Sequence, residues 1–269
     1  MNALQYQSPN VPMLGKGMIL LDRLDANGNL TGAIPIGNVP KFGLDLKDDL
    51  AEQYSSMNAS SSLIATALKK RQIKISITGT DFKPDVQAIA MMSGGKSSLA
   101  VAAASILAEV LASATSTKKG RYFQTKNRNL DPATGFSTVV LKGGVAGATV
   151  YAIGTDFMVA DPVQGLIYIP SGSSVDEAHA LTLDYHTLVA TFDQVAGGTV
   201  PRVTAKLTFS PDPTDGQKIG IEVWKVNFSP TGTQEFIADD YGNWQLEGLV
   251  LDDTANHPTD PFYLATFYP

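Results

Sequence analysis

The feature that most constrains this chain is a pair of alternating runs between Asn38 and Phe82, separated by a polar, serine-rich stretch. In each run apolar residues take every second position. This period of two is typical of a β-strand with one buried and one solvated face. The expected buried residues are Phe42, Leu44 and Leu46, then Ile73, Ile75 and Ile77. The first alternation breaks at Asp48, and the gap is too long for a tight turn. The two runs therefore predict a long β-ribbon.

Patterning on either side of the ribbon indicates a mainly β chain. Residues 18–24 and 30–36 read as a hairpin, because Asn27-Gly28 supplies the positive φ angles that such turns need. Alternating strands are expected again near residues 181–185, 203–209, 219–223 and 244–250. One short helix is expected within 81–92, with Asp85 as its cap and Gly94-Gly95 as its stop.

The middle of the chain has a different character. Residues 97–113 are rich in alanine, with Leu99, Ala103, Ile106 and Val110 on one stripe, which favours a helix. Residues 115–183 then read as a small β unit with strands near 137–141, 149–153 and 166–169. The predicted division is 1–96, 97–183 as a linker and inserted module, and 184–269.

Composition excludes several classes of site. The chain has no cysteine, so disulfides and thiolate metal sites are impossible. Residues 184–269 hold 12 acidic and 4 basic side chains, which argues against nucleic-acid binding by that part. No apolar run reaches the roughly 20 residues that span a bilayer, and the first residues lack the features of a signal peptide. We expect no membrane insertion.

No catalytic constellation is evident. The three histidines, His179, His186 and His257, lie in no triad or zinc motif. Ser93-Gly94-Gly95-Lys96-Ser97 lacks the first glycine of a phosphate loop, because Ala90 stands there. We therefore expect a non-enzyme without cofactor or metal.

Three segments resemble the major tail tube protein of long-tailed bacteriophages. The ribbon sequence GNVPKFGLDLKDDLAEQYSS, followed by a basic-apolar strand that ends in ITGTDF, has the family's order of an aromatic, an acidic run and a Ser-Ser end. GNWQLEGLVLDD resembles the family's closing strand. YAIGTDFMVADPVQGLIYIPSG resembles an inserted module of larger members. The resemblance covers most of the chain and is weakest at both ends and over residues 97–113.

The resemblance implies a tail-tube-type β-sandwich or partial barrel, with a long β-ribbon, a short helix and an inserted small β module. Subunits of this family form stacked hexameric rings, a virion tube assembled in the host cytoplasm, through which DNA passes without specific binding. The implied partners are other copies of the chain and the tape measure, tail-tip and tail-terminator proteins. The candidate lumen or ring-interface residues are Asp45, Asp48, Asp49 and Glu52. The candidate stacking loop holds Ser55, Ser56, Met57 and Asn58.

Two alternatives stay open at this point. One is another ring protein of the same fold, such as a tail terminator, a baseplate hub component or a type VI secretion tube. The other is a carbohydrate-binding or adhesive β module that uses Trp224, Trp244 and Tyr241 as a stacking platform.

Overall fold

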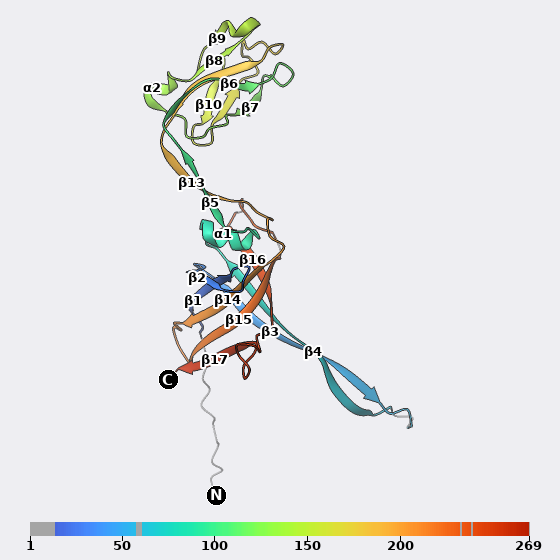
Figure 1. Ribbon diagram of the computed structural model, residues 1–269. Helices are drawn as coiled ribbons and strands as arrows, with labels where there is room; N and C mark the ends of the chain where they lie inside the picture. The colour runs from blue at the N-terminus through green and yellow to red at the C-terminus, as the bar shows by residue number, and fades with distance from the viewer. Residues whose placement is uncertain (1–13, 58–60, 232, 238, 269) are drawn as a thin grey trace. The chain divides into compact units, whose positions relative to one another are not determined.

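The computed structural model describes residues 14–57, 61–231, 233–237 and 239–268. It confirms a mainly β chain and divides it into two compact units (Figure 1). Unit 1 comprises residues 1–96 and 195–269, and unit 2 comprises residues 97–194. The predicted module ended at 183. The strand that begins at Leu181 instead belongs to unit 2, because it pairs with two strands of that unit.

Unit 1 is built on an eight-stranded sheet in the order β2-β1-β14-β15-β16-β4-β3, with β17 also paired to β15. Every pairing in it is antiparallel. Its strands are β1 Gly17–Leu24, β2 Leu30–Pro35, β3 Lys41–Tyr54, β4 Leu63–Gly79, β14 Val203–Pro211, β15 Lys218–Pro230, β16 Trp244–Val250 and β17 Tyr263–Tyr268.

The pairing of the predicted hairpin and ribbon is confirmed. The expected burial of Leu46 is wrong: it is 55% exposed, because β16 covers β4 only as far as Lys74. β1 pairs with β2 around the Asn27-Gly28 turn, where the Asp25 carboxylate accepts hydrogen bonds from the backbone N–H of Asn27 and Asn29. In the ribbon, Phe42 lies opposite Ile77 and Leu46 opposite Ile73. The alternation seen in the sequence therefore sets the register.

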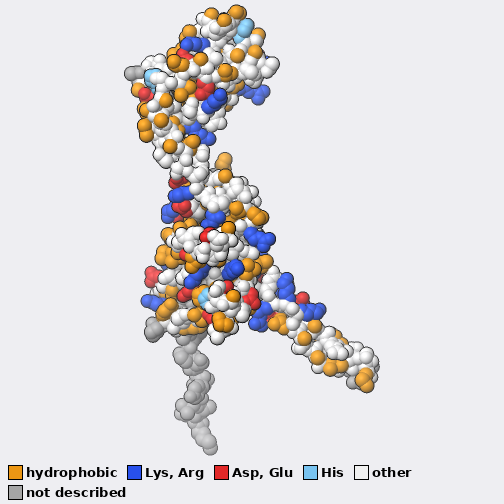
Figure 2. Space-filling view, viewed as in Figure 1, with side chains coloured by type: hydrophobic (Ala, Val, Ile, Leu, Met, Phe, Trp, Pro, Cys, Tyr) orange, Lys and Arg blue, Asp and Glu red, His pale blue; other side chains and the backbone are white. Residues whose placement is uncertain are grey.

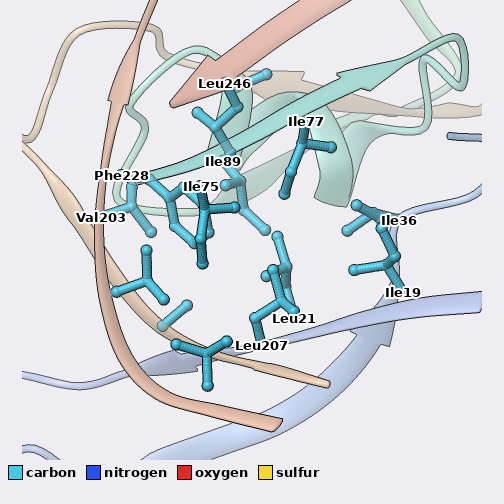
Figure 3. Packing of buried hydrophobic residues seen from close by; sticks show 14 of the residues in the cluster. Ile19, Leu21, Ile36, Ile75, Ile77, Ile89, Val203, Leu207, Phe228 and Leu246 are labelled. Carbon is cyan, nitrogen blue, oxygen red and sulfur yellow. The ribbon is translucent and has the colours of Figure 1, made fainter. Parts of the chain in front are cut away.

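The core of unit 1 forms where the alternating strands turn their apolar faces together. Figure 3 shows Leu21, Ile75 and Phe228, from three different strands, pointing toward one another. Trp244 is also fully buried, and its indole Nε1 donates to the Asp81 carbonyl at 2.8 Å. Of the predicted inward residues of the late strands, Val203 and Leu246 are buried, whereas Phe209, Ile219 and Ile221 are half-buried.

The short helix α1, Pro84–Ala90, buries Val86 and Ile89 in this core. Its predicted cap is wrong. Lys83 holds the N-cap position without a side-chain cap, and Asp85 lies in the first turn, 3.0 Å from the Lys96 ammonium. The helix also ends before Gly94-Gly95, at the C-cap Met91.

Unit 2 is a small sandwich of a three-stranded sheet, β10-β11-β7, and a four-stranded sheet, β6-β12-β8-β9. Both sheets contribute to one core, in which Ile167 and Leu183 are fully buried. Its strands are β5 Lys96–Val101, β6 Ala104–Ala112, β7 Arg121–Gln124, β8 Val140–Gly143, β9 Thr149–Tyr151, β10 Met158–Asp161, β11 Leu166–Ile169, β12 Leu181–Thr187 and β13 Ala190–Val195. β5 pairs with β13. Two short helical segments are α2 Ala133–Phe136 and η1 Val145–Gly147.

The helix expected over residues 97–113 is wrong, because β5 and β6 occupy that stretch. β6 pairs with β12, and the Asp184 carboxylate accepts from the backbone N–H of Ala108 at 2.6 Å, where the chain bulges with φ of 51°. Alanine's helix propensity is a weak preference that tertiary pairing overrides. The strand predicted at 166–169 is confirmed, whereas those near 137–141 and 149–153 are shifted or shortened.

Candidate assembly interface

The main feature of unit 1 outside its core is a two-stranded extension of β3 and β4, which we call the arm. It comprises residues 46–54 and 63–73. β16 pairs with β4 only over Lys74–Gly79, so within the described residues the arm has no third strand beside it. Figure 1 shows the two strands continuing together beyond the rest of the sheet of unit 1.

Strand register gives the arm two different faces. Side chains alternate along β3, so Leu46, Leu50 and Tyr54 share a face with the cross-strand partners Leu68 and Leu63. These five side chains are about half exposed, from 47% to 55%. Figure 2 shows hydrophobic side chains on the visible surface of the arm. We call this the apolar face. The opposite, polar face carries Lys47, Asp49, Gln53, Lys70 and Gln72, together with Ala51, Ala65 and Ala67.

The apolar face is interrupted by charge at two positions. Asp48 lies opposite Arg71, and the guanidinium donates two hydrogen bonds of 2.9 Å to its carboxylate. This bidentate contact lowers the pKa of Asp48. Glu52 lies between Leu50 and Tyr54 on the same face, and its carboxylate accepts a hydrogen bond from the Tyr54 hydroxyl at 2.5 Å.

The four carboxylates expected to act together are split by this register. Asp48 and Glu52 lie on the apolar face, whereas Asp45 and Asp49 lie on the other side of β3, opposite Lys74 and Lys70. β3 has four acidic and two basic side chains, and β4 has four basic ones and no acidic one, so the ribbon carries a net charge of +2. The ribbon by itself is therefore not an acidic surface.

The expected stacking loop lies at the tip of the arm. Ser55 is buried, and its backbone N–H donates to the Ser62 carbonyl at 2.7 Å. Its hydroxyl accepts from the Met57 N–H at 3.2 Å. Ser56 is exposed, and Met57 is 92% exposed. Asn58 lies outside the described residues.

The sequence interpretation missed the apolar face, because it ended the alternation at Asp48. The signal was present: Leu46, Leu50 and Tyr54 keep an even spacing across the two acidic positions. Because Asp48 is paired across the ribbon with Arg71, a charged side chain at an otherwise apolar position does not end the strand.

The tryptophans do not form the stacking platform considered above. Trp244 is 1% exposed. The Trp224 ring stacks on the His257 imidazole with centroids 3.8 Å apart, and its Nε1 donates to the Asp260 carbonyl. Tyr241, by contrast, is exposed. A flat, open aromatic surface of the kind that stacks on sugars is therefore not made by these three residues.

Histidines and carboxylates give no sign of a metal centre or triad in the described part of the chain. His179 contacts Asp176 and His257 contacts Asp253. No group of three or more His, Asp or Glu side chains within residues 14–57, 61–231, 233–237 and 239–268 is placed to hold a metal ion. None of the described helices has the length and apolar character to cross a membrane.

The fold and the arm together define a mainly β, two-unit protein with a projecting amphipathic ribbon. Comparison with known families finds that the model of one family, described as "Protein of unknown function UCP028589", matches residues 12–262. The chain belongs to this family. A search of curated proteins finds no match.

Proposed function

We propose that this protein is a structural subunit that polymerises as stacked hexameric rings into the tail tube of a long-tailed bacteriophage, the channel through which DNA leaves the capsid. The observation that carries the proposal is the arm with its uncovered apolar face. A two-stranded ribbon alone is at best marginally stable in water. Exposed apolar side chains gathered on one face and bordered by charged residues mark an interaction site.

The sheet of unit 1 supports self-association in a second way. Its outermost strands are β2 at one end and β3 at the other, so among the described strands each has one edge without a partner. Free edges are templates for pairing with another chain, and closure into a barrel removes them. Contacts between different surfaces of identical copies generate rings or filaments, according to the rotation between neighbours. The number six and the phage origin rest on the resemblance of the sequence.

In this proposal the acidic residues on the two sides of β3 have different surroundings. Asp48 and Glu52 lie at the contact between copies, whereas Asp45 and Asp49 face away from it. DNA passes without specific binding, and the tape measure, tail-tip and tail-terminator proteins are the further partners. Localisation is the virion, after assembly in the host cytoplasm.

Negative-stain electron microscopy of the concentrated protein, with light-scattering mass, tests the proposal. Hollow tubes with six-fold end views are expected, on a tail-tip seed if not spontaneously. Single rings that never stack would favour a terminator or hub component. A strictly monomeric protein that also fails to polymerise on a tail-tip seed would refute the proposal.

A matched pair of variants ties assembly to the arm. Leu50 and Leu68 are cross-strand partners on the apolar face, and Ala51 and Ala67 are the next pair on the polar face. Replacing the first pair with aspartate (L50D/L68D) is expected to abolish assembly. The same change at the second pair (A51D/A67D) adds the same charges one residue from the first and is expected to leave assembly intact. Equal effects of the two variants on assembly would show that the apolar face has no specific role in it.

A further inference from the structure

The base of the ribbon borders a groove of about 490 Å³ in unit 1. Its apolar lining includes Phe42, Leu44, Phe209 and Ile221, which are half-buried and pack against the core. The ring centroids of Phe42 and Phe209, which both line it, lie 5.7 Å apart. We call this the Phe42–Phe209 groove.

The groove and the arm form one continuous surface. Phe42 and Leu44 lie on the same side of β3 as Leu46, Leu50 and Tyr54, because side chains at even-numbered positions of this strand point to one face. One strip therefore runs from the groove to the tip of the arm, with the Asp48–Arg71 ion pair along it. Every copy of the chain carries both a projecting apolar ribbon and a hollow that could receive one.

The charges along this strip determine which occupant fits. Glu52 lies between Leu50 and Tyr54, and the guanidinium of Arg71 on the same face is already bound to Asp48. Covering the apolar face would remove water from the Glu52 carboxylate, which is costly unless a cation replaces it. Lys16 and Lys41 line the groove, are exposed, and have no carboxylate partner among the described residues.

We propose that the arm of one copy lies in the Phe42–Phe209 groove of the next, with the Glu52 carboxylate held by Lys16 or Lys41. Two arms facing each other would leave Glu52 without a cation and both grooves open. Placing the arm of one copy in the groove of the next covers both the apolar face and the groove. The contact repeats from copy to copy, because each copy's own groove receives the arm of another. This inference rests on the proposed function for its role in a tube, but the contact is tested separately.

Because the chain has no cysteine, single engineered cysteines give a clean test. One population carries L50C on the apolar face of the arm. A second carries P40C at the exposed rim of the groove, together with a short tag that changes its mobility on a gel. Oxidising the mixture is expected to give a disulfide-linked dimer of one tagged and one untagged chain. Unchanged tryptophan fluorescence confirms that both variants are folded.

A matched control and a charge exchange sharpen the result. A51C, one position along and on the polar face, is expected to form at least about tenfold less cross-link with P40C than L50C does. E52K in the arm population is expected to reduce the yield about tenfold, the scale of a close interfacial charge pair. Lys16→Glu with Lys41→Glu in the groove population is expected to restore it.

The outcomes are separable from those of the tube proposal. Cross-linking of L50C to itself as efficiently as to P40C would replace this contact with arm-to-arm packing. Failure of the mixed cross-link overturns the inference, whether or not tubes form. A mixed cross-link without tubes would instead retain the contact and count against the tube.

Discussion

Removing one hydroxyl group from the core of unit 2 tests, at three pH values, how much a buried hydrogen bond contributes to the stability of that unit. Tyr185 in β12 is fully buried, and its hydroxyl donates to the Glu109 carboxylate at 2.5 Å and accepts from the Asn127 amide at 3.0 Å. Burial, and then the hydrogen bond to Glu109, raise the pKa of Tyr185 to about 12. In Tyr185→Phe, Glu109 keeps its contact with the Lys126 backbone N–H at 2.7 Å but loses the hydroxyl.

The expected cost at pH 7 is about 2 kcal/mol, the range for a buried hydrogen bond to a charged group. The pH dependence follows from the raised pKa. The unfolded tyrosine ionises near pH 10, whereas the folded one resists ionisation until about pH 12. The stabilisation by the hydroxyl is therefore complete below pH 10 and is lost as pH rises through 12, by about 1.4 kcal/mol for each pH unit between these values. At pH 11 the difference between the two proteins should fall by about 1.4 kcal/mol.

Urea unfolding of both proteins at pH 7, 9 and 11 measures this difference. Far-UV circular dichroism is the suitable probe, because Trp224 and Trp244 both lie in unit 1 and their fluorescence reports on that unit. Lysine titration is common to both proteins and cancels in the comparison. Tyr122→Phe, which removes a hydroxyl from a ring that is 63% exposed, is the control and should change little. A Tyr185→Phe difference below about 0.5 kcal/mol at pH 7, or one that stays constant to pH 11, would refute the reasoning.

Three further expectations follow from other contacts. Gly79→Ala should destabilise unit 1 by about 1–3 kcal/mol, measured by urea unfolding followed by tryptophan fluorescence. The reason is that a Cβ at position 79 would lie 2.1 Å from Cζ2 of the buried Trp244. Gly43→Ala is the control, because its Cβ would meet only the Ser76 hydroxyl at 3.4 Å. The Lys142 ammonium, and then the Ala108 N–H, lower the pKa of Asp184. Its stabilisation is thus present above the ordinary value near 3.9 and lost as pH falls through the lowered pKa, so the deficit of Asp184→Asn at pH 7 should vanish in acid; a deficit that persists would contradict the ion pair. Excising residues 97–194 behind a short Gly-Ser link should leave cooperative unfolding of unit 1, because Gly198 and Val200 donate backbone hydrogen bonds to Met91 and Met92 beside the junction; loss of that transition would show that unit 1 depends on unit 2.

Local alternation made most of unit 1 predictable. The half-buried Phe42 and the buried Ile77 are directly opposite one another, as two matching period-two runs require. Trp244 and Leu246 were likewise placed by their spacing alone. These positions are decided by which face meets the core, and that information is local.

The rest depended on partners far away in the sequence. Residues 97–113 have a helical composition, yet β6 is fixed by β12, about 75 residues later. The second boundary of the module was misplaced because β12 alternates in the same way as the strands of unit 1. The arm was cut short at Asp48 because its neutralisation by Arg71 is visible only once the ribbon is paired. The candidate carboxylates were grouped by nearness in sequence, whereas the strand period separates them into two faces.

The interrupted order of unit 1 sets the timing of its folding. β1 pairs with β14, so Gly17 must meet Pro211 although the whole of unit 2 lies between them in the sequence. During synthesis unit 2 is complete before β14 leaves the ribosome, and we expect it to fold first, as contiguous domains do. Once unit 2 is folded, the pairing of β5 with β13 brings the chain that enters β5 near the chain that leads to β14, and a long flexible loop is replaced by a short one. Loop-closure entropy falls accordingly, so the insert acts as a built-in folding aid for the sheet that surrounds it.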